Sequence, residues 1–240
     1  MTILCLETST KSCSVALGQN GKLIALKESI DAKHSHAENL TRYIEEVCRQ
    51  ARIHLKDIDA VAVSKGPGSF TGLRIGVSTA KGLCYALDKP LIGISSLEAM
   101  AAGQVSSLKS QVSSLFCPMI DARRMEVYCA LYDENIKEIC PASAEIVDEN
   151  FISKVLSNKS HISHFTSPLY FFGDGAEKCK SQIKSTNAIF IDGINPSARF
   201  MIPLAEKYFD EKKFENLAYF EPFYLKDFFT PSISPKGEGL

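Results

Sequence analysis

Short apolar runs separated by turn residues open the chain. Thr2 to Leu6 and Cys13 to Gly18 are rich in small and β-branched residues, and Lys22 to Glu28 resumes the extended pattern. Between the second and third runs, Gly18-Gln19-Asn20-Gly21 supplies turn residues that tolerate a positive φ. The pattern predicts three strands in a meander.

Helical spacing follows this meander. The capping box Ser35-His36-Ala37-Glu38 predicts a helix from Ser35 to Arg52, with one stripe of apolar side chains. A buried strand, Ala60 to Ser64, leads through a glycine-rich loop into a second helix, Thr71 to Leu87, which ends at Asp88-Lys89-Pro90.

A short strand and a third helix complete the first half. Leu91 to Ile94 reads as the strand, and a second capping box, Ser95-Ser96-Leu97-Glu98, opens a helix through Met100 toward Gly103. The predicted order is three strands, a helix, a strand, a helix and a strand. This order implies a mixed sheet covered by helices.

The second half repeats this shape weakly. Phe116 to Asp121 and Glu126 to Tyr132 predict a hairpin like that of Leu4 to Leu17, so we expect two related halves. Further on, the pattern predicts strands at Leu169 to Phe172 and Ala188 to Ile191 and a helix from Ser197 to Phe209.

The expected domain organisation follows from these elements. A first α/β lobe covers residues 1–103, and a second, smaller lobe covers 116–230. Between them, Gln104 to Leu108 recurs as Gln111 to Leu115, which predicts a surface insertion or helix extension at 104–115. Residues 231–240, with Pro, Ser, Gly and Lys, predict a flexible tail.

Composition narrows the class of protein. The 240 residues are 45% hydrophobic and 23% charged, as in an ordinary globular protein. The net charge of -1 provides no bulk attraction for nucleic acid or anionic lipid, so any RNA contact has to be local. The sequence has no apolar run of about 18 residues that could cross a bilayer, and no signal-like N-terminus.

Eight cysteines are scattered singly, with no Cys-x-x-Cys pair. This spacing argues against a zinc ribbon and against a disulfide scaffold. Many unpaired thiols fit a reducing compartment, so we predict a cytoplasmic protein.

The strongest local feature is the glycine-rich run from Gly66 to Gly76 between a strand and a helix. It is neither a Walker A loop nor a dinucleotide-binding fingerprint, so it is weak evidence for phosphate binding. Gly72, Gly76, Ala80 and Cys84 recur every four residues, which favours close packing of another backbone on this helix. The spacing leaves open whether that backbone belongs to this chain or to a partner.

Other candidate sites are weaker. His34-x-His36 straddles the capping box, so the two side chains diverge and a metal site is not favoured. Glu7 and Asp121 end strands, where acids can reach a metal or a water, but single acids there are more often cap or turn residues. The aromatic C-terminal region, Tyr208 to Phe229, could stack bases, but burial against the core is favoured.

Four motifs together carry a resemblance to a known family. They are Leu4-Cys5-Leu6-Glu7-Thr8-Ser9, Gly66-Pro67-Gly68-Ser69-Phe70-Thr71-Gly72-Leu73-Arg74-Ile75-Gly76, Asp121-Ala122-Arg123-Arg124-x-Glu126-Val127-Tyr128 and Gly173-Asp174-Gly175. The chain resembles the TsaB (YeaZ) family from its N-terminus to about Tyr224-Leu225-Lys226. Only 104–115 and the tail fall outside the resemblance.

The resemblance implies an actin-like, ribonuclease H-like α/β fold of two lobes with a reduced second lobe. It implies a non-catalytic dimerisation subunit in threonylcarbamoylation of the adenosine next to the anticodon, in tRNAs that read codons beginning with A. The implied partners are a TsaD-like transferase paralogue and, in the assembled complex, a TsaE-like ATPase. We expect tRNA to bind only through the complex, and a homodimer when the subunit is alone.

The same resemblance implies no catalytic residue, metal or cofactor in this subunit, since ATP, threonine and bicarbonate are used elsewhere in the pathway. The family motif residues, carried over position by position, are Glu7, Thr8, Ser9, Gly66, Pro67, Gly68, Ser69, Thr71, Arg74, Asp121, Arg123, Arg124, Gly173, Asp174 and Gly175. The family's partner surface falls on the first two helices, and the expected interface residues are Leu40, Ile44, Val47, Gly72, Ile75, Gly76, Thr79, Ala80 and Leu83.

Two other functions compete with this one. A small actin-like ATPase or kinase would use Glu7 or Asp121 with a nucleotide and Mg²⁺. However, Asp121-Ala122-Arg123-Arg124 lacks the glycines that a second phosphate loop needs. A metalloprotease is less favoured, because the sequence has no His-Glu-x-x-His or equivalent ligand set.

Overall fold

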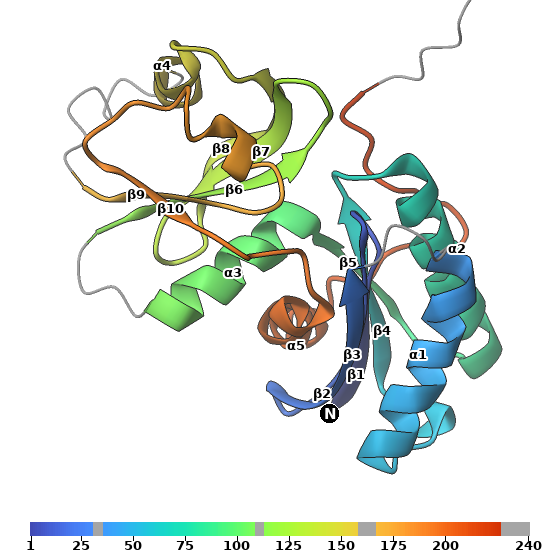
Figure 1. The fold of residues 1–240 in the computed structure, drawn as a ribbon. Coiled ribbons are helices and arrows are strands. Elements are labelled where there is room, and N and C mark those ends of the chain that lie inside the picture. Colours follow the sequence, from blue (N-terminus) through green and yellow to red (C-terminus); the bar gives the residue numbers. More distant parts are fainter. Residues whose placement is uncertain (31–35, 109–112, 158–166, 227–240) are drawn as a thin grey trace, which may run out of the picture.

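The computed structural model describes residues 1–30, 36–108, 113–157 and 167–226, which form two lobes (Figure 1). The first lobe is built on a five-stranded sheet of order β3-β2-β1-β4-β5. β1 to β3 form the predicted antiparallel meander, and β4 and β5 add parallel to β1. The strands are β1 (Thr2–Glu7), β2 (Ser12–Gln19), β3 (Lys22–Ile30), β4 (Ala60–Gly66) and β5 (Leu91–Ser95).

Helices cover both faces of this sheet. Leu4 and Leu6 point toward α1 (His36–Ala51) and α2 (Phe70–Leu87) on one face. Ile3 and Cys5 point toward α3 (Ser96–Leu108) and α5 (Ile202–Asp210) on the other. Because successive side chains of a strand point to opposite faces of the sheet, the apolar residues of β1 contribute to a hydrophobic core on each face.

The second lobe repeats the strand order of the first. Its five-stranded sheet has the order β10-β9-β6-β7-β8, with β6 to β8 antiparallel and β9 and β10 parallel to β6. The expected two-lobed α/β fold of actin-like topology is therefore confirmed. The strands are β6 (Leu115–Asp121), β7 (Glu126–Tyr132), β8 (Glu138–Ile146), β9 (Leu169–Phe172) and β10 (Ala188–Ile191).

Helix α3 joins the lobes and continues to Leu108, so residues 104–108 belong to this helix. Leu97, Met100 and Ala101 of α3 pack against the second sheet, whereas its Ala99 and Ala102 pack against the first. In Figure 1, α3 and α5 lie between the two sheets. One helix thus contributes to the cores of both lobes.

The domain boundary expected at 116–230 needs correction. Ile202, Leu204 and Ala205 of α5 pack against β1 and β5 of the first lobe, because these residues form the buried face of an amphipathic helix. The chain therefore returns to the first lobe after β10. The expected tail, 231–240, lies outside the described residues.

Several elements differ from the sequence expectation. The predicted helix 197–209 begins as a 3-10 turn, Ala198–Met201, before α5, since Pro203 near the start of α5 has no N–H to donate. Strand β8, helix α4 (Phe151–Ser157) and the 3-10 turns Leu55–Asp57 and Glu177–Cys179 were not predicted. No helix of the described parts is long and apolar enough to span a membrane.

Candidate functional site: the facing turns and the outer surface of α2

The turn between β1 and β2 is packed directly under α2. The Thr8 hydroxyl donates a hydrogen bond to the Gly72 carbonyl at 2.8 Å. A Cβ at Gly72 would lie 2.1 Å from the Thr8 carbonyl, and one at Gly76 would lie 2.3 Å from the Thr8 Oγ1. Gly72 and Gly76 are therefore needed for close approach to this chain's own turn, which answers for these two positions the question that spacing left open.

The glycine-rich loop before α2 packs on the same turn. The Ser69 N–H donates to the Ser9 carbonyl at 2.6 Å, and a Cβ at Gly68 would lie 2.2 Å from that carbonyl. Ser69 also caps α2, since its Oγ accepts from the Gly72 N–H at 3.4 Å. The Ser69 N–H of the loop and the Gly72 N–H of the first turn of α2 are thus already bonded within the chain, which favours a structural role over phosphate binding.

Glu7, at the end of β1, is fully buried. One carboxylate oxygen, Oε1, accepts from the Ser9 N–H at 2.6 Å, and the other, Oε2, has no hydrogen-bond partner in the described structure. Burial raises the pKa of Glu7 above its ordinary value, despite hydrogen bonds from Ser9, Ser64 and Thr8 that lower it. Burial therefore disfavours the charged carboxylate that a metal ion would require.

Asp121 is the corresponding acid of the second lobe and is paired. Its Oδ1 forms an ion pair with Lys178 and accepts from the Arg123 N–H at 2.9 Å. Burial alone would raise the pKa of Asp121, but the Lys178 ammonium and the Arg123 N–H outweigh it and lower the pKa. The positive charge of Lys11 contributes to this lowering, so the β1–β2 turn faces Asp121 across the lobes.

The remaining motif residues of the second lobe surround Asp121. Its N–H donates to Asp174 Oδ1 at 3.2 Å. Gly173 has a φ of 108°, and a Cβ there would lie 2.1 Å from the Met119 carbonyl, so this turn requires glycine. Arg123 and Arg124 have φ values of 72° and 49°, which are uncommon for residues with a side chain. The structure therefore brings the family motifs together in two groups of turns, one at the end of each sheet.

The expected interface residues divide into two sets. Ile75, Thr79 and Leu83 are half-buried at the surface of α2. The others face the chain's own core, because each lies on the stripe that packs against the sheet or its turns, so they are not surface contacts of this fold. These buried residues are Leu40, Ile44, Val47, Gly72, Gly76 and Ala80.

Small residues also line the outer side of α2, and the sequence analysis missed them. Ser78, Gly82 and Ala86 are exposed, and among the described residues no heavy atom outside the adjoining helix backbone lies within 4 Å of a Cβ placed at Gly82. Beside them, Tyr85 is 84% exposed and Arg74 stacks its guanidinium 5.0 Å from the Phe70 ring centroid. We call Arg74, Ser78, Gly82, Tyr85 and Ala86 the outer ridge. Its signal was a second spacing of four residues, 78, 82 and 86.

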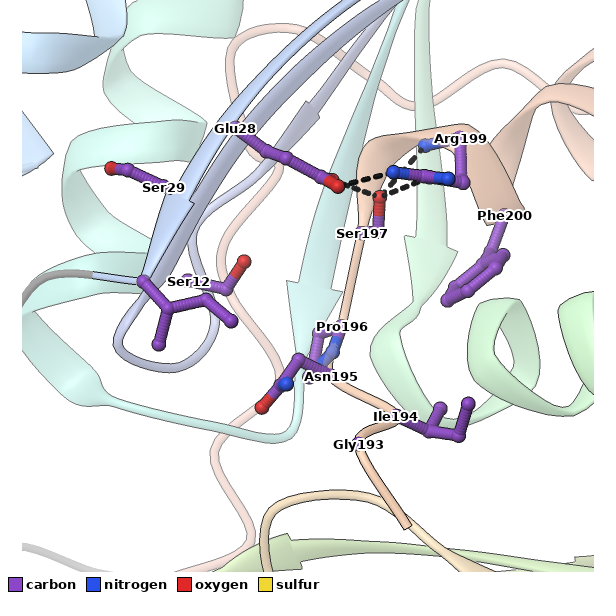
Figure 2. A pocket seen from close by; sticks show the side chains of 11 residues that line it. Ser12, Glu28, Ser29, Gly193, Ile194, Asn195, Pro196, Ser197, Arg199 and Phe200 are labelled. Atoms are coloured by element: carbon purple, nitrogen blue, oxygen red, sulfur yellow. Dashed lines mark hydrogen bonds and ion pairs between the residues drawn. The ribbon is translucent and has the colours of Figure 1, made fainter. Parts of the chain in front are cut away.

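A cavity of about 440 Å³ opens beside β3, where the chain returns from the second lobe (Figure 2). At its wall, Glu28 Oε2 accepts from the hydroxyls of Ser14 at 3.1 Å and Ser197 at 2.6 Å, and Glu28 is ion-paired with Arg199. These polar groups satisfy one another, so they tie the returning segment to β2 and β3. This network could not be predicted from the sequence, because Glu28 is about 170 positions from Ser197 and Arg199.

The described residues contain no group of three or more His, Cys, Asp and Glu side chains arranged to hold a metal ion. His36 lies at the start of α1, and its Nε2 donates to the Thr10 carbonyl at 2.7 Å. His34 and Ser35 of the expected capping box lie outside the described residues.

Burial explains only part of the aromatic C-terminal region. Phe220 is buried in the core of the first lobe. Tyr208 of α5 is partly buried and packs against the core on the other face of the same sheet. Tyr219 is 83% exposed, however, and Phe214 and Phe223 are also exposed. The expectation of general burial is therefore wrong for these three, because they lie on an irregular segment at the surface.

Comparison with known proteins agrees with these motifs. The family model "TsaD: tRNA N6-adenosine threonylcarbamoyltransferase" matches residues 29–228. The tRNA threonylcarbamoyladenosine biosynthesis protein TsaB of Haemophilus influenzae is 31% identical over 236 residues, covering 95% of this chain and 94% of that protein. TsaB of Escherichia coli is 30% identical, with 95% of each chain covered.

Solved structures show the same fold. YeaZ from Pseudomonas aeruginosa superposes with a TM-score of 0.75 at 24% identity, covering 93% of this chain and 99% of that one. A second Pseudomonas aeruginosa structure, described as similar to peptidase YEAZ, gives 0.78 at 24% identity and covers 94% and 99%. The chain therefore belongs to the TsaB (YeaZ) family and takes part in tRNA threonylcarbamoyladenosine biosynthesis.

Proposed function

We propose that this chain is the non-catalytic subunit that binds and activates a TsaD-like transferase paralogue. The reaction is threonylcarbamoylation of the adenosine next to the anticodon, in tRNAs that read codons beginning with A. The observation that carries the proposal is the outer ridge of α2, an exposed surface on a protein of this family.

The outer ridge has the chemistry of a helix-packing surface. The distance between packed helices follows the size of the side chains between them, so Ser78, Gly82 and Ala86 permit close approach. Tyr and Arg are the residue types that contribute most often to binding energy at interfaces, and Tyr85 and Arg74 flank the small residues. Ile75, Thr79 and Leu83, which are half-buried, follow Arg74, Ser78 and Gly82 along α2.

The two strand-end acids support a non-catalytic role. Burial disfavours the charged form of Glu7, and Asp121 is ion-paired with Lys178. The ion pair with Lys178 occupies Asp121, and burial keeps Glu7 away from water, so neither acid is placed to hold a metal or to activate a water. The subunit therefore needs no cofactor of its own, and ATP, threonine and bicarbonate are used by other proteins of the pathway.

The same surface serves two assemblies in this proposal. Alone, the subunit forms a cytoplasmic homodimer through α2, and the TsaD-like partner replaces one copy. The TsaE-like ATPase joins the assembled complex. Since the chain has a net charge of -1, tRNA binds to the complex rather than to the isolated subunit.

The test replaces Gly82 with arginine. The open space around Gly82 lets Gly82→Arg fold, whereas a change at Gly76 would disturb the contact with Thr8 and test only stability. Size-exclusion chromatography with light scattering should show a heterodimer of the parent chain with the TsaD-like paralogue from the same genome. We expect Gly82→Arg to weaken it at least about tenfold, which corresponds to about 1.4 kcal/mol.

The matched control is Ser153→Arg, an exposed position on α4 of the second lobe. It adds the same side chain away from α2 and should leave the heterodimer unchanged. Separate elution of the parent chain and the paralogue, or equal binding by Gly82→Arg, would contradict the proposal.

A further inference from the structure

The segment that follows α5, residues 211–226, runs back over the first lobe, and we call it the strap. The Glu215 N–H donates to the Leu91 carbonyl of β5 at 2.9 Å. Because β5 is the last strand of its sheet, the strap covers an edge that would otherwise be unpaired. In Figure 1 the strap, coloured orange to red, passes α2 and ends on the side of the second lobe.

The middle of the strap is anchored firmly. Phe220 is 8% exposed and belongs to the core of the first lobe, where its ring fills the space beside Gly93. The Lys81 ammonium of α2 donates to the carbonyls of Ala218 at 3.2 Å and Phe220 at 3.1 Å. The strap thus touches α2 next to the outer ridge.

Beyond this anchor, the strap fits against the loop that precedes α2. The Phe223 N–H donates to the Lys65 carbonyl at 2.7 Å. Gly66 has a φ of 110°, and a Cβ there would lie 2.6 Å from the Phe223 carbonyl, so the two backbones approach as closely as glycine allows. The Tyr224 ring lies 5.1 Å from that of Phe70, the ring on which Arg74 stacks.

The last described residue of the strap reaches the second lobe. Lys226 forms an ion pair with the Glu126 carboxylate of β7, and its ammonium lies 5.9 Å from the Tyr128 ring centroid. The Glu126 carbonyl in turn accepts from Lys178 at 2.8 Å, and Lys178 is paired with Asp121. Contacts therefore run without a break from Arg74 on the outer ridge to the turn at Asp121.

We propose that residues 223–226 form a clasp between the lobes. Closed, the clasp holds the start of α2 in a fixed relation to the turn 121–126 of the second lobe. The partner surface and the second lobe are then energetically coupled, a step that rests on the proposed function of α2. The clasp opens more readily than the rest of the strap, because partly exposed contacts hold it while Phe220 stays buried.

The first test uses the free chain and needs no partner. Hydrogen exchange measured by mass spectrometry should show faster exchange in peptides covering 66–73 and 121–128 after Lys226→Glu. The expected increase is at most about fivefold, the range of an exposed ion pair. The charge swap Lys226→Glu with Glu126→Lys should restore the parent rates, because it restores the pair with its signs reversed.

Lys180→Glu is a matched control. Lys180 pairs with Asp192 and lies over the Phe190 ring, so it has the same two kinds of contact, but both partners belong to the second lobe. It should leave exchange in 66–73 unchanged. Parent-like exchange in Lys226→Glu, or an equal change in Lys180→Glu, would overturn the clasp.

The second test uses the TsaD-like paralogue. Lys226→Glu should weaken its binding by up to about fivefold, although Lys226 is not on α2, and the charge swap should restore it. If the paralogue binds the parent and Lys226→Glu equally, the coupling to the partner surface is wrong. If it does not bind the parent chain, the proposed function fails, and the exchange result alone decides the clasp.

Discussion

Glu7 makes the stability of the protein depend on pH. Burial holds its pKa in the folded state above the ordinary value of 4.5, so the folded chain binds this proton more tightly than the unfolded chain does. The stability that the folded chain gains from binding this proton is fully present below about pH 4.5 and decreases as the pH rises through the higher folded-state pKa. We therefore predict that Glu7→Gln, which cannot ionise, loses less stability than the parent as the pH rises above 4.5.

Urea denaturation at several pH values measures this difference. The variant keeps an oxygen to accept from the Ser9 N–H, and Glu45→Gln on the exposed side of α1 serves as the control for removing one carboxylate. Parallel pH profiles for Glu7→Gln and the parent would show that Glu7 is not held in a neutral state.

The burial of Glu7 could not be predicted from the sequence. A single acid at the end of a strand reads as a cap or a turn residue, and that interpretation fits Asp121, whose carboxylate bonds the Arg123 N–H. Glu7 differs because Gly72 and Gly76 let α2 pack closely against the Thr8–Ser9 turn. This packing excludes water from the Glu7 carboxyl group. Burial there depends on residues more than 60 positions away.

At the scale of the element, we expect alanine substitutions at two glycines of α2 to change the stability of the protein in opposite directions. Gly76→Ala places a methyl group 2.3 Å from Thr8 Oγ1, so we expect a loss of about 1–3 kcal/mol in the free energy of unfolding. Gly82→Ala meets no neighbour and removes chain entropy from the unfolded state, so we expect a gain of up to about 1 kcal/mol.

Denaturant unfolding of the two variants, each on the same helix and each adding one methyl group, measures both effects. Equal changes in the midpoint would mean that α2 does not approach the Thr8 turn as closely as described. The comparison also checks which side of α2 is the outer ridge before any partner is added.

The spacing of small residues predicted close packing but not its direction. Along α2 the positions 72, 76 and 80 face the sheet, and 78, 82 and 86 face outward, so both sides show the same period.

Two elements were not predicted because of features in their own sequences. Strand β8 contains Pro141 and two register irregularities against β7, which break its alternation, and α4 has only seven residues. The meander of β1 to β3 and the hairpin of β6 and β7 were predictable, because each is made of short apolar runs separated by turn residues.

At the scale of the whole molecule, α3 makes the two lobes one cooperative unit. Its two faces belong to different cores, so unfolding either lobe exposes apolar side chains of the same helix. Within the first lobe, the network of Glu28 with Ser14, Ser197 and Arg199 fixes the segment by which the chain returns from the second lobe. We therefore expect one unfolding transition rather than two.

The cysteines provide probes of both lobes for this expectation. All eight are buried, with Cys5, Cys13, Cys48 and Cys84 in the first lobe and Cys117, Cys129, Cys140 and Cys179 in the second. Burial raises the pKa of Cys5 from 9.0 to about 12, which lowers its thiolate fraction about a thousandfold and blocks alkylation of the folded chain.

Alkylation at increasing urea concentrations, mapped by mass spectrometry, should modify both sets of cysteines at one midpoint. Modification of the second-lobe cysteines at a lower urea concentration would show that the smaller lobe unfolds first, and that α3 remains folded on the first sheet without it. Because the two sets of cysteines report on the two lobes separately, they can show the effect of removing a contact between the lobes. The first variant to examine is therefore Lys226→Glu. The clasp joins the lobes in addition to α3, so its loss should keep one common midpoint for both sets of cysteines and lower the urea concentration of that midpoint only slightly.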